Sequence, residues 1–296
     1  MPPQWRAGAT YLAYRTAAAA AERVPEAAAL RMVDWLSGVV VPVLGRRGAM
    51  VARHVRRVRG RPLTRAEERR AVRQSVSSYA RYWVESLRLS AMDPAEVDRR
   101  FSIDGLNHIR AARTAGTGAV LALPHVGGWE VGGSWLVRQG FPLTVVVEPL
   151  QPPQLFEWFA GLRASFGFTV IPLGPGAGTE VLRALRANQV VALLSDRDLG
   201  GRGVEVEFFG ERTTLPGGPA TLALRAGAPV LPTAVYFAGR GHHAVVRPPI
   251  PLERTASLRA DVARLTQSIA YEMEDLIRAA PEQWHLFQPN WPSDRQ

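Results

Sequence analysis

A histidine and a glutamate stand alone in an uncharged stretch of the chain. In LALPHVGGWE, His125 and Glu130 are five positions apart, and no other charged or imidazole side chain lies between Thr114 and Arg138. A histidine can take the proton of a hydroxyl group, and a nearby carboxylate can fix its tautomer and stabilise the imidazolium. The pair therefore predicts general-base chemistry on a hydroxyl, which is a poor nucleophile at neutral pH.

The elements around His125 are expected to expose it at a ligand site. The apolar run before it is typical of a buried strand, and a helix is predicted to start at Gly127 or Gly128. Ligands of open α/β sheets bind outside the carboxyl ends of the strands. The glycines would let a substrate approach the backbone, and the free N–H groups of the helix start could hold an oxyanion or phosphate. The spacing alone also fits a helix-capping histidine and a surface glutamate.

The 296-residue chain divides into a helical part and an alternating part. Residues 1–100 show apolar positions at helical spacings, with a capping box at Thr64 and Glu67. From residue 101 onwards, strand-like runs alternate with helical stretches. We expect one domain over 1–296, an α/β fold with a central twisted, largely parallel sheet flanked by helices and an N-terminal helical segment. The expected strands are 118–123, 143–148, 168–173, 190–195, 204–209, 229–237 and 243–248.

Two further acids are predicted to reach the same edge of the sheet. Glu148 ends one expected strand, and Asp196 follows another, so both should emerge near His125. Glu148 could accept hydrogen bonds from sugar hydroxyls. Arg163, which follows an aromatic stretch, could bind an acid or a substrate phosphate. Structural ion pairs are the alternative for Glu148 and Arg163.

Charge and composition restrict the partners. The chain has no cysteine, which excludes disulfides and thiolate chemistry, and we expect no metal. All 36 cationic residues are arginine, and the stretch from Arg46 to Arg73 holds 11 of them against two glutamates, a net of +9. This cluster suits anionic lipid headgroups or cofactor phosphates, or is a solvated helix face. Aromatic residues are not interleaved, so no nucleic acid is expected.

Neither a targeting signal nor a rival catalytic motif is evident in the sequence. No signal peptide or roughly 20-residue apolar span is evident, so we expect a peripheral protein at the cytoplasmic face of the cell membrane. GPGAG at 174–178 follows a strand, but Pro175 and Thr179 do not fit a dinucleotide-binding G-x-G-x-x-G. A serine hydrolase is disfavoured because no G-x-S-x-G is present. The pair His242 and His243 is expected at the surface.

Several blocks in sequence order resemble one enzyme family. LALPHVGGWE is similar to the H-x4-D/E signature of the glycerolipid acyltransferase superfamily, and tryptophan before the acid is typical of its branch of bacterial lipid A lauroyl/myristoyl acyltransferases. RDLGGRGVEVEFFGE (197–211) and WHLFQPNW (284–291) most resemble the actinobacterial phosphatidylinositol mannoside acyltransferases. The resemblance extends over about residues 75–292.

The resemblance implies a reaction and its catalytic residues. A palmitoyl-type chain would move from acyl-CoA (palmitoyl-CoA), which is the donor substrate, to a mannose hydroxyl of a glycolipid, without a permanently bound cofactor. His125 would be the base. Asp196 stands where the family has glutamate and would orient His125, whereas Glu130 stands where the family has aspartate. Each exchange moves a carboxylate by about one methylene, so which acid contacts His125 stays open.

The same resemblance assigns substrate-binding residues. Glu148 and Arg163 match positions around the acceptor, and Arg197 and Asp198 complete the SDRD block. The small residues from Gly127 to Ser134 would leave room for an acyl chain, or serve close helix–sheet packing. We expect a monomer that meets an anionic membrane surface. Another glycolipid or a lysolipid is the alternative acceptor. The catalytic candidates are His125, Glu130 and Asp196, and the substrate-binding candidates are Glu148, Arg163, Arg197, Asp198, Gly127 and Gly128.

Overall fold

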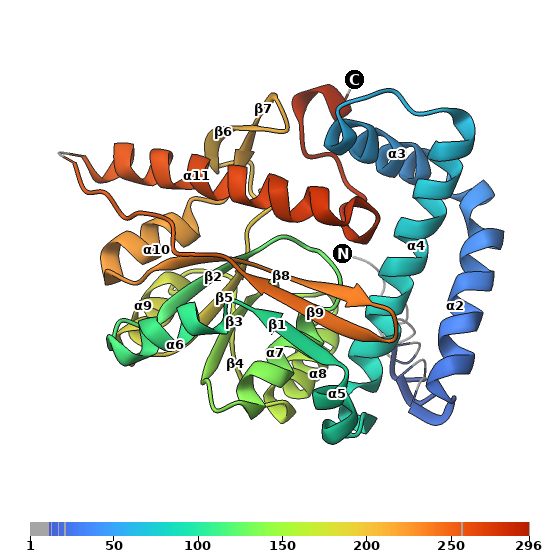
Figure 1. Ribbon diagram of the computed structural model, residues 1–296, viewed down its shortest axis with the longest axis horizontal. Helices are drawn as coiled ribbons and strands as arrows, with labels where there is room; N and C mark the ends of the chain where they lie inside the picture. The colour runs from blue at the N-terminus through green and yellow to red at the C-terminus, as the bar shows by residue number, and fades with distance from the viewer. Residues whose placement is uncertain (1–11, 13, 17, 21, 256, 296) are drawn as a thin grey trace.

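A twisted seven-stranded sheet runs through the centre of the computed structural model, which describes residues 12, 14–16, 18–20, 22–255 and 257–295 (Figure 1). The strand order is β1-β9-β8-β2-β5-β3-β4, and every neighbouring pair is parallel except β8 with β9. The predicted α/β fold with a largely parallel sheet is confirmed. The strands are β1 (Phe101–Asp104), β2 (Ala119–Leu123), β3 (Leu143–Val147), β4 (Phe168–Pro172), β5 (Val190–Leu194), β8 (Val230–Ala238) and β9 (Gly241–Val246).

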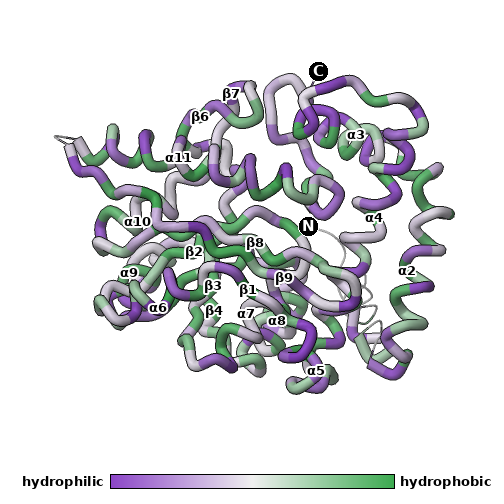
Figure 2. The backbone as a smooth tube through the Cα atoms, in the orientation of Figure 1, coloured by the Kyte–Doolittle hydropathy of each residue, from purple (hydrophilic) through white to green (hydrophobic). Residues whose placement is uncertain are grey.

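Helices cover both faces of this sheet. One face packs against α9 (Ala177–Arg186), α10 (Gly218–Ala226) and α11 (Leu258–Ala279), and the other against α6 (Leu106–Thr114) and α7 (Trp129–Arg138), with α8 (Pro153–Ser165) beside β4. Every residue of β2 is buried, because a central parallel strand is covered on both sides. Two hydrophobic cores result, one on each face, and the central strands are correspondingly apolar in Figure 2.

Two details of the strand prediction need correction. The run 204–209 is a strand, but it belongs to a separate antiparallel hairpin of β6 (Val204–Phe208) and β7 (Glu211–Leu215). Phe209 and Gly210 form its turn with φ of 52° and 74°, the left-handed conformation that two-residue hairpin turns require. Neither the short strand β1 nor β7 was predicted.

The N-terminal helices form a layer at one side of the sheet (Figure 1). They are α2 (Glu26–Val40), α3 (Arg46–Arg59), α4 (Arg65–Arg88) and α5 (Pro94–Arg99). The capping box at Thr64 and Glu67 is present. α4 packs against α2, α3 and α7, so the helical part is joined to the catalytic candidate region. The predicted helical character of residues 1–11 lies outside the described residues.

Membrane-spanning potential is confined to a bent helix pair. Within the described ranges, no single helix is long and apolar enough to cross a membrane. The segments Glu26–Val43 and Arg46–Arg59 meet the length and composition test only together, and they are bent by 104° at their junction.

Glycines on α7 bring this helix close to the sheet. A Cβ on Gly132 would lie 2.6 Å from Cγ2 of Val235, and a Cβ on Gly133 would lie 2.7 Å from Cζ of Phe168. Neighbouring side chains therefore occupy the position that a Cβ would take at each glycine. Close helix–sheet packing is thus observed at these two positions, and both glycines also line a cavity between α7 and the sheet.

This packing predicts that Gly132→Val lowers the free energy of unfolding by about 1–3 kcal/mol, because the added side chain overpacks the contact with Val235. Gly161→Val is the matched control, since Gly161 also lies in a helix and a Cβ there meets nothing within 4 Å. Urea unfolding of both variants measures the difference. Equal stabilities would contradict the packing role of Gly132.

Candidate active site

The ends of two neighbouring parallel strands bring His125 and Asp196 together. His125 lies two residues beyond β2, and Asp196 lies two residues beyond β5, which pairs with β2 in parallel. Nδ1 of His125 is 2.6 Å from Oδ1 of Asp196, and the backbone N–H of His125 donates to Oδ2 at 3.1 Å. Asp196, and not Glu130, is therefore the acid that contacts His125.

Asp196 is a buried carboxylate that remains ionised. Burial favours its neutral form, but His125 and the indole N–H of Trp284, which donates to Oδ2 at 2.7 Å, outweigh burial and lower the pKa of Asp196 to about 2. An ionised acceptor at this position holds the proton of the imidazole on Nδ1. Nε2 of His125 is then left as a base for a substrate proton.

Glu130 forms a different ion pair, with Arg163. Nε of Arg163 donates to Oε1 of Glu130 at 2.9 Å, and the hydroxyl of Tyr82 donates to the same oxygen at 3.4 Å. Burial acts to lower the pKa of Arg163, but Glu130 outweighs it and raises that pKa. The expectation that Glu130 folds back toward the imidazole of His125 is thus not met in the structure. Its carboxylate instead joins the start of α7 to α8.

His125 lies between two hollows. A cavity of about 270 Å³ lies between α7 and the sheet and is mainly apolar, and a wider cleft of about 710 Å³ opens over α9 and α10. His125 lines both, as do Glu148 and Arg197. The site therefore offers a space for a hydrocarbon chain on one side of the imidazole and a second, larger space on the other.

The predicted substrate-binding residues differ in what they contact. Glu148 is half exposed and lies 3.7 Å from the guanidinium of Arg197, so these two residues form a common wall of both hollows. Arg197 also donates to Gln288 at 3.0 Å. Asp198 accepts bonds from the backbone of Gly200, Gly201 and Gly203 and from Thr214. Its carboxylate shapes the loop before β6 at the rim of the cleft.

The backbone N–H groups of Gly127 and Gly128 are hydrogen-bonded within the protein. The N–H of Gly127 donates to the carbonyl of Gln283 at 3.0 Å, and that of Gly128 donates to the carbonyl of Val235 at 2.9 Å. A Cβ on Gly127, whose φ is +61°, would lie 2.1 Å from the carbonyl oxygen of Val235. These two amides are therefore engaged, and the glycines fit the loop after β2 against β8.

Sequence reasoning missed the contribution of the C-terminal segment. Within WHLFQPNW, the indole N–H of Trp284 donates to the carboxylate of Asp196 at 2.7 Å, and Nδ2 of Asn290 donates to the backbone carbonyl of Asp196 at 3.1 Å. A buried tryptophan normally has an acceptor for its indole N–H. This rule alone could have predicted a hydrogen bond from Trp284 to a buried acceptor. The segment runs antiparallel to the loop after β2, with Val126 opposite Trp284.

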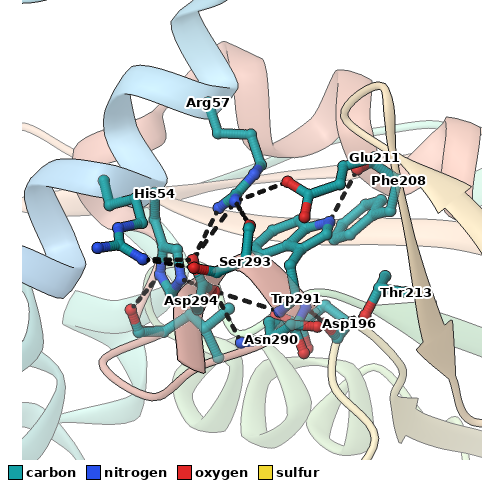
Figure 3. A network of polar contacts seen from close by, with 12 residues as sticks. His54, Arg57, Asp196, Phe208, Glu211, Thr213, Asn290, Trp291, Ser293 and Asp294 are labelled. Atoms are coloured by element: carbon teal, nitrogen blue, oxygen red, sulfur yellow. Dashed lines mark hydrogen bonds and ion pairs between the residues drawn. The ribbon is translucent and has the colours of Figure 1, made fainter. Parts of the chain in front are cut away.

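A polar network fixes that segment to α3 (Figure 3). Asp294 is buried and accepts hydrogen bonds from Nε2 of His54 at 3.1 Å and from the backbone of Asn290 at 3.0 Å. Arg57 donates to Ser293 at 2.9 Å. Burial acts to raise the pKa of Asp294, but the hydrogen bonds from His54 and from the backbone of Asn290 lower it well below its ordinary value. The network holds the residues that surround Asp196 in place.

The prediction that His242 and His243 both lie at the surface is correct only for His243. His243 is partly exposed beside Asp104, but His242 is buried and its Nε2 is 2.8 Å from Glu85, which also binds Arg81. This cluster lies directly behind Gly128. Across the described parts of the chain, no group of three or more His, Asp or Glu side chains is arranged to hold a metal ion.

Comparison with known proteins identifies the class. The family described as bacterial lipid A biosynthesis acyltransferase matches residues 6–293. The chain therefore belongs to this family of acyltransferases, and the resemblance seen in its motifs is confirmed.

The chain is also similar to individual acyltransferases of known name. The chain is 46% identical over 225 residues to the phosphatidylinositol mannoside acyltransferase of Mycobacterium tuberculosis (strain CDC 1551 / Oshkosh), covering 74% of this chain and 70% of the relative. It is 40% identical over 245 residues to the protein of the same name from Mycolicibacterium smegmatis, covering 82% and 79%. The lipid A biosynthesis acyltransferase of Haemophilus influenzae is 29% identical over 195 residues, covering 64% and 58%.

The lowered pKa of Asp196 predicts how stability depends on pH. In the folded protein the carboxylate of Asp196 becomes protonated only near pH 2. The ionised carboxylate therefore stabilises the folded protein fully above about pH 4, and the free energy of unfolding falls by about 2 kcal/mol as the pH is lowered to 2. Asp196→Asn removes this titration. Urea unfolding at pH 5, 3 and 2 should show a steeper loss for the wild type than for the variant, and parallel losses would contradict the assignment.

Proposed function

We propose that this chain transfers a long acyl chain, of the palmitoyl type, from acyl-CoA to a mannose hydroxyl of a phosphatidylinositol mannoside. The observation that carries the proposal is the pair of His125 and Asp196, placed between an apolar cavity and an open cleft. The names of the mycobacterial relatives support the acceptor class. The apolar lining of the cavity supports a hydrocarbon chain as the group transferred.

The chemistry of the proposed reaction follows from the free Nε2 of His125. This nitrogen takes the proton of the acceptor hydroxyl while the hydroxyl oxygen attacks the thioester carbonyl carbon. When the carbonyl re-forms, the carbon–sulfur bond breaks and the thiolate takes the proton from the imidazolium. Asp196 stabilises the charged imidazole and stays ionised itself, because its pKa is lowered to about 2.

The two hollows suggest how the donor is placed. The acyl chain would lie in the cavity beneath α7, and the polar part of the donor would lie in the wider cleft. Arg197 and Arg225 line that cleft together with the first residues of α9 and α10, and positive charge and helix N-termini both favour phosphate groups. This arrangement supports CoA as the carrier of the acyl chain.

An exposed apolar face on α2 supports association with a membrane. Six large apolar side chains follow one another at alternating spacings of three residues and one residue, which places them on one side of the helix and its extension. Trp35 is 66% exposed and Val43 is 79% exposed, and Figure 2 shows apolar residues recurring along α2. The six residues are Met32, Trp35, Leu36, Val39, Val40 and Val43.

The arginine cluster divides into paired and unpaired members. Arg53, Arg56, Arg57, Arg61 and Arg73 form ion pairs with acids of this chain. Six others are exposed and have no ion pair with any residue that the structure describes, and two of these directly follow the apolar face of α2. They are Arg46, Arg47, Arg59, Arg65, Arg69 and Arg70. Apolar and cationic groups next to each other suit an anionic lipid surface at the cytoplasmic side of the membrane.

The acyltransferase proposal predicts that His125→Ala lowers transfer by about 10²–10⁴-fold, since the general base is lost. Palmitoyl-CoA is incubated with phosphatidylinositol mannosides, another glycolipid and a lysolipid, and the products are identified by mass spectrometry. His243→Ala serves as the control, because that histidine lies on β9 outside both hollows. Full transfer by the His125 variant would refute the mechanism. Palmitoyl loaded on an acyl carrier protein tests the carrier, and preference for it would refute CoA as the donor.

The membrane proposal predicts that Trp35→Glu with Val39→Glu weakens binding to vesicles containing phosphatidylinositol by tenfold or more, because two inserted apolar groups become charged. Replacing Arg46 and Arg47 by glutamate should weaken binding similarly and make it less sensitive to salt. Tyr271→Glu is the control, as Tyr271 is 51% exposed on α11. Vesicle sedimentation measures all three, and unchanged binding of the first two variants would refute the surface.

A further inference from the structure

A second histidine, His285, lies beside His125 and has a nitrogen without a partner. Its backbone N–H donates to the carbonyl of His125 at 2.8 Å, and its ring, which lines the apolar cavity, is 7% exposed. Nε2 is 2.9 Å from Oγ of Ser78. Nδ1 is buried and makes no hydrogen bond to any residue in the described ranges. A buried polar atom left unpaired costs about 1–3 kcal/mol, so it calls for an explanation.

The proton of the neutral imidazole of His285 can lie on either ring nitrogen. The hydroxyl of Ser78 has its hydrogen-bond contact with Nε2. If Ser78 donates to Nε2, both groups are satisfied at this contact, and the imidazole proton lies on Nδ1. In that tautomer Nδ1 carries the unpaired N–H. The ring of His285 lies near those of Tyr82 and Trp129, with centroid distances of 5.7 and 5.6 Å, and all three residues line the cavity.

The imidazole of His285 is suited to donate without becoming charged. Burial, followed by the proximity of His125, lowers the pKa of His285 to about 3. The ring is therefore neutral at the pH values where His125 would act as a base. His285 is thus a hydrogen-bonding group and not a second proton acceptor.

The reaction needs such a donor near His125. Attack on a thioester places negative charge on the carbonyl oxygen, and a preorganised N–H that meets this oxygen stabilises the transition state. The sequence had suggested backbone amides at the start of α7, but those of Gly127 and Gly128 donate to Gln283 and Val235. Nδ1 of His285 has no hydrogen-bond partner among the described residues, and His285 lines the same cavity as His125.

We propose that His285 donates a hydrogen bond from Nδ1 to the carbonyl oxygen of the acyl thioester while that oxygen carries negative charge. The inference rests on the proposed acyl transfer. In the step concerned, the acceptor oxygen forms a bond to the carbonyl carbon and the π electrons move to the carbonyl oxygen. Their return breaks the carbon–sulfur bond, and the proton held by His125 passes to the thiolate.

Two amide substitutions separate this role from a structural one. In His285→Asn, the amide lies near the position of Nδ1 and the bond to Ser78 is lost. In His285→Gln, the amide reaches the position of Nε2 and the group at Nδ1 is lost. We expect the Gln variant and His285→Phe to lower kcat by about 10²–10³-fold, the usual effect of removing one oxyanion donor. The Asn variant should stay within about tenfold of the wild type.

The rates to measure are hydrolysis of palmitoyl-CoA by water and transfer to phosphatidylinositol mannoside, with the KM for each substrate and the Tm of each variant. Both reactions form the same oxyanion, so both kcat values should fall together with little change in KM. An active Gln variant with an inactive Asn variant would show a structural role through Ser78 and overturn the proposal. So would a loss of transfer with unchanged hydrolysis, which would place His285 on the acceptor.

The hydrolysis readout keeps this test separate from the proposed function. A wild type that hydrolyses palmitoyl-CoA but acylates no phosphatidylinositol mannoside would refute the proposed acceptor. The order of the Asn, Gln and Phe variants in hydrolysis would still support or overturn the role of His285.

Discussion

The arrangement of the site depends on one buried carboxylate, Asp196, at the end of β5. An ionised acid away from water is stable only if its oxygens are paired. Asp196 is paired by the imidazole and backbone of His125 and by the indole of Trp284. The same contacts that stabilise the carboxylate in the interior therefore also orient the imidazole of His125, so the stability of the interior and the geometry of the site are coupled.

This requirement explains why the end of the chain returns to the sheet. Trp284 reaches Asp196 from 88 positions along the sequence, and the segment that carries it is held by Asp294, His54 and Arg57 (Figure 3). α3 contributes two of these side chains. The helical N-terminal part thus supports the region around His125 through the C-terminal segment, although α3 itself lines neither hollow.

Much of the fold followed from periodicity, because buried parallel strands are continuous apolar runs and the helices between them are amphipathic. The meeting of His125 and Asp196 also followed, since neighbouring parallel strands end at one edge. The sequence did not show which acid would contact the imidazole. Glu130 is on the first turn of α7, and its direction depends on Arg163, which α8 supplies. Neither β1, which has four residues, nor β7, whose sequence ERTTL lacks an apolar run, was predicted, and nothing in the run 204–209 showed that its strand belongs to a separate hairpin.

The contacts that Trp284 and His285 make near His125 could not be predicted from the sequence for a different reason. Both lie in an aromatic block that composition assigns to a core, and that assignment is correct for their burial. Their contacts with the site depend on individual nitrogen atoms whose positions are set by tertiary packing. Periodicity describes which face of an element is buried, but it does not describe which polar atom within the buried face meets an acid.

Because His125, Glu148 and Arg197 line both hollows, one long ligand could extend from the apolar cavity past the imidazole into the open cleft. In the proposed reaction the donor would take this path, with its thioester beside His125. The depth of the apolar cavity would then limit which chain lengths bring the thioester to the imidazole.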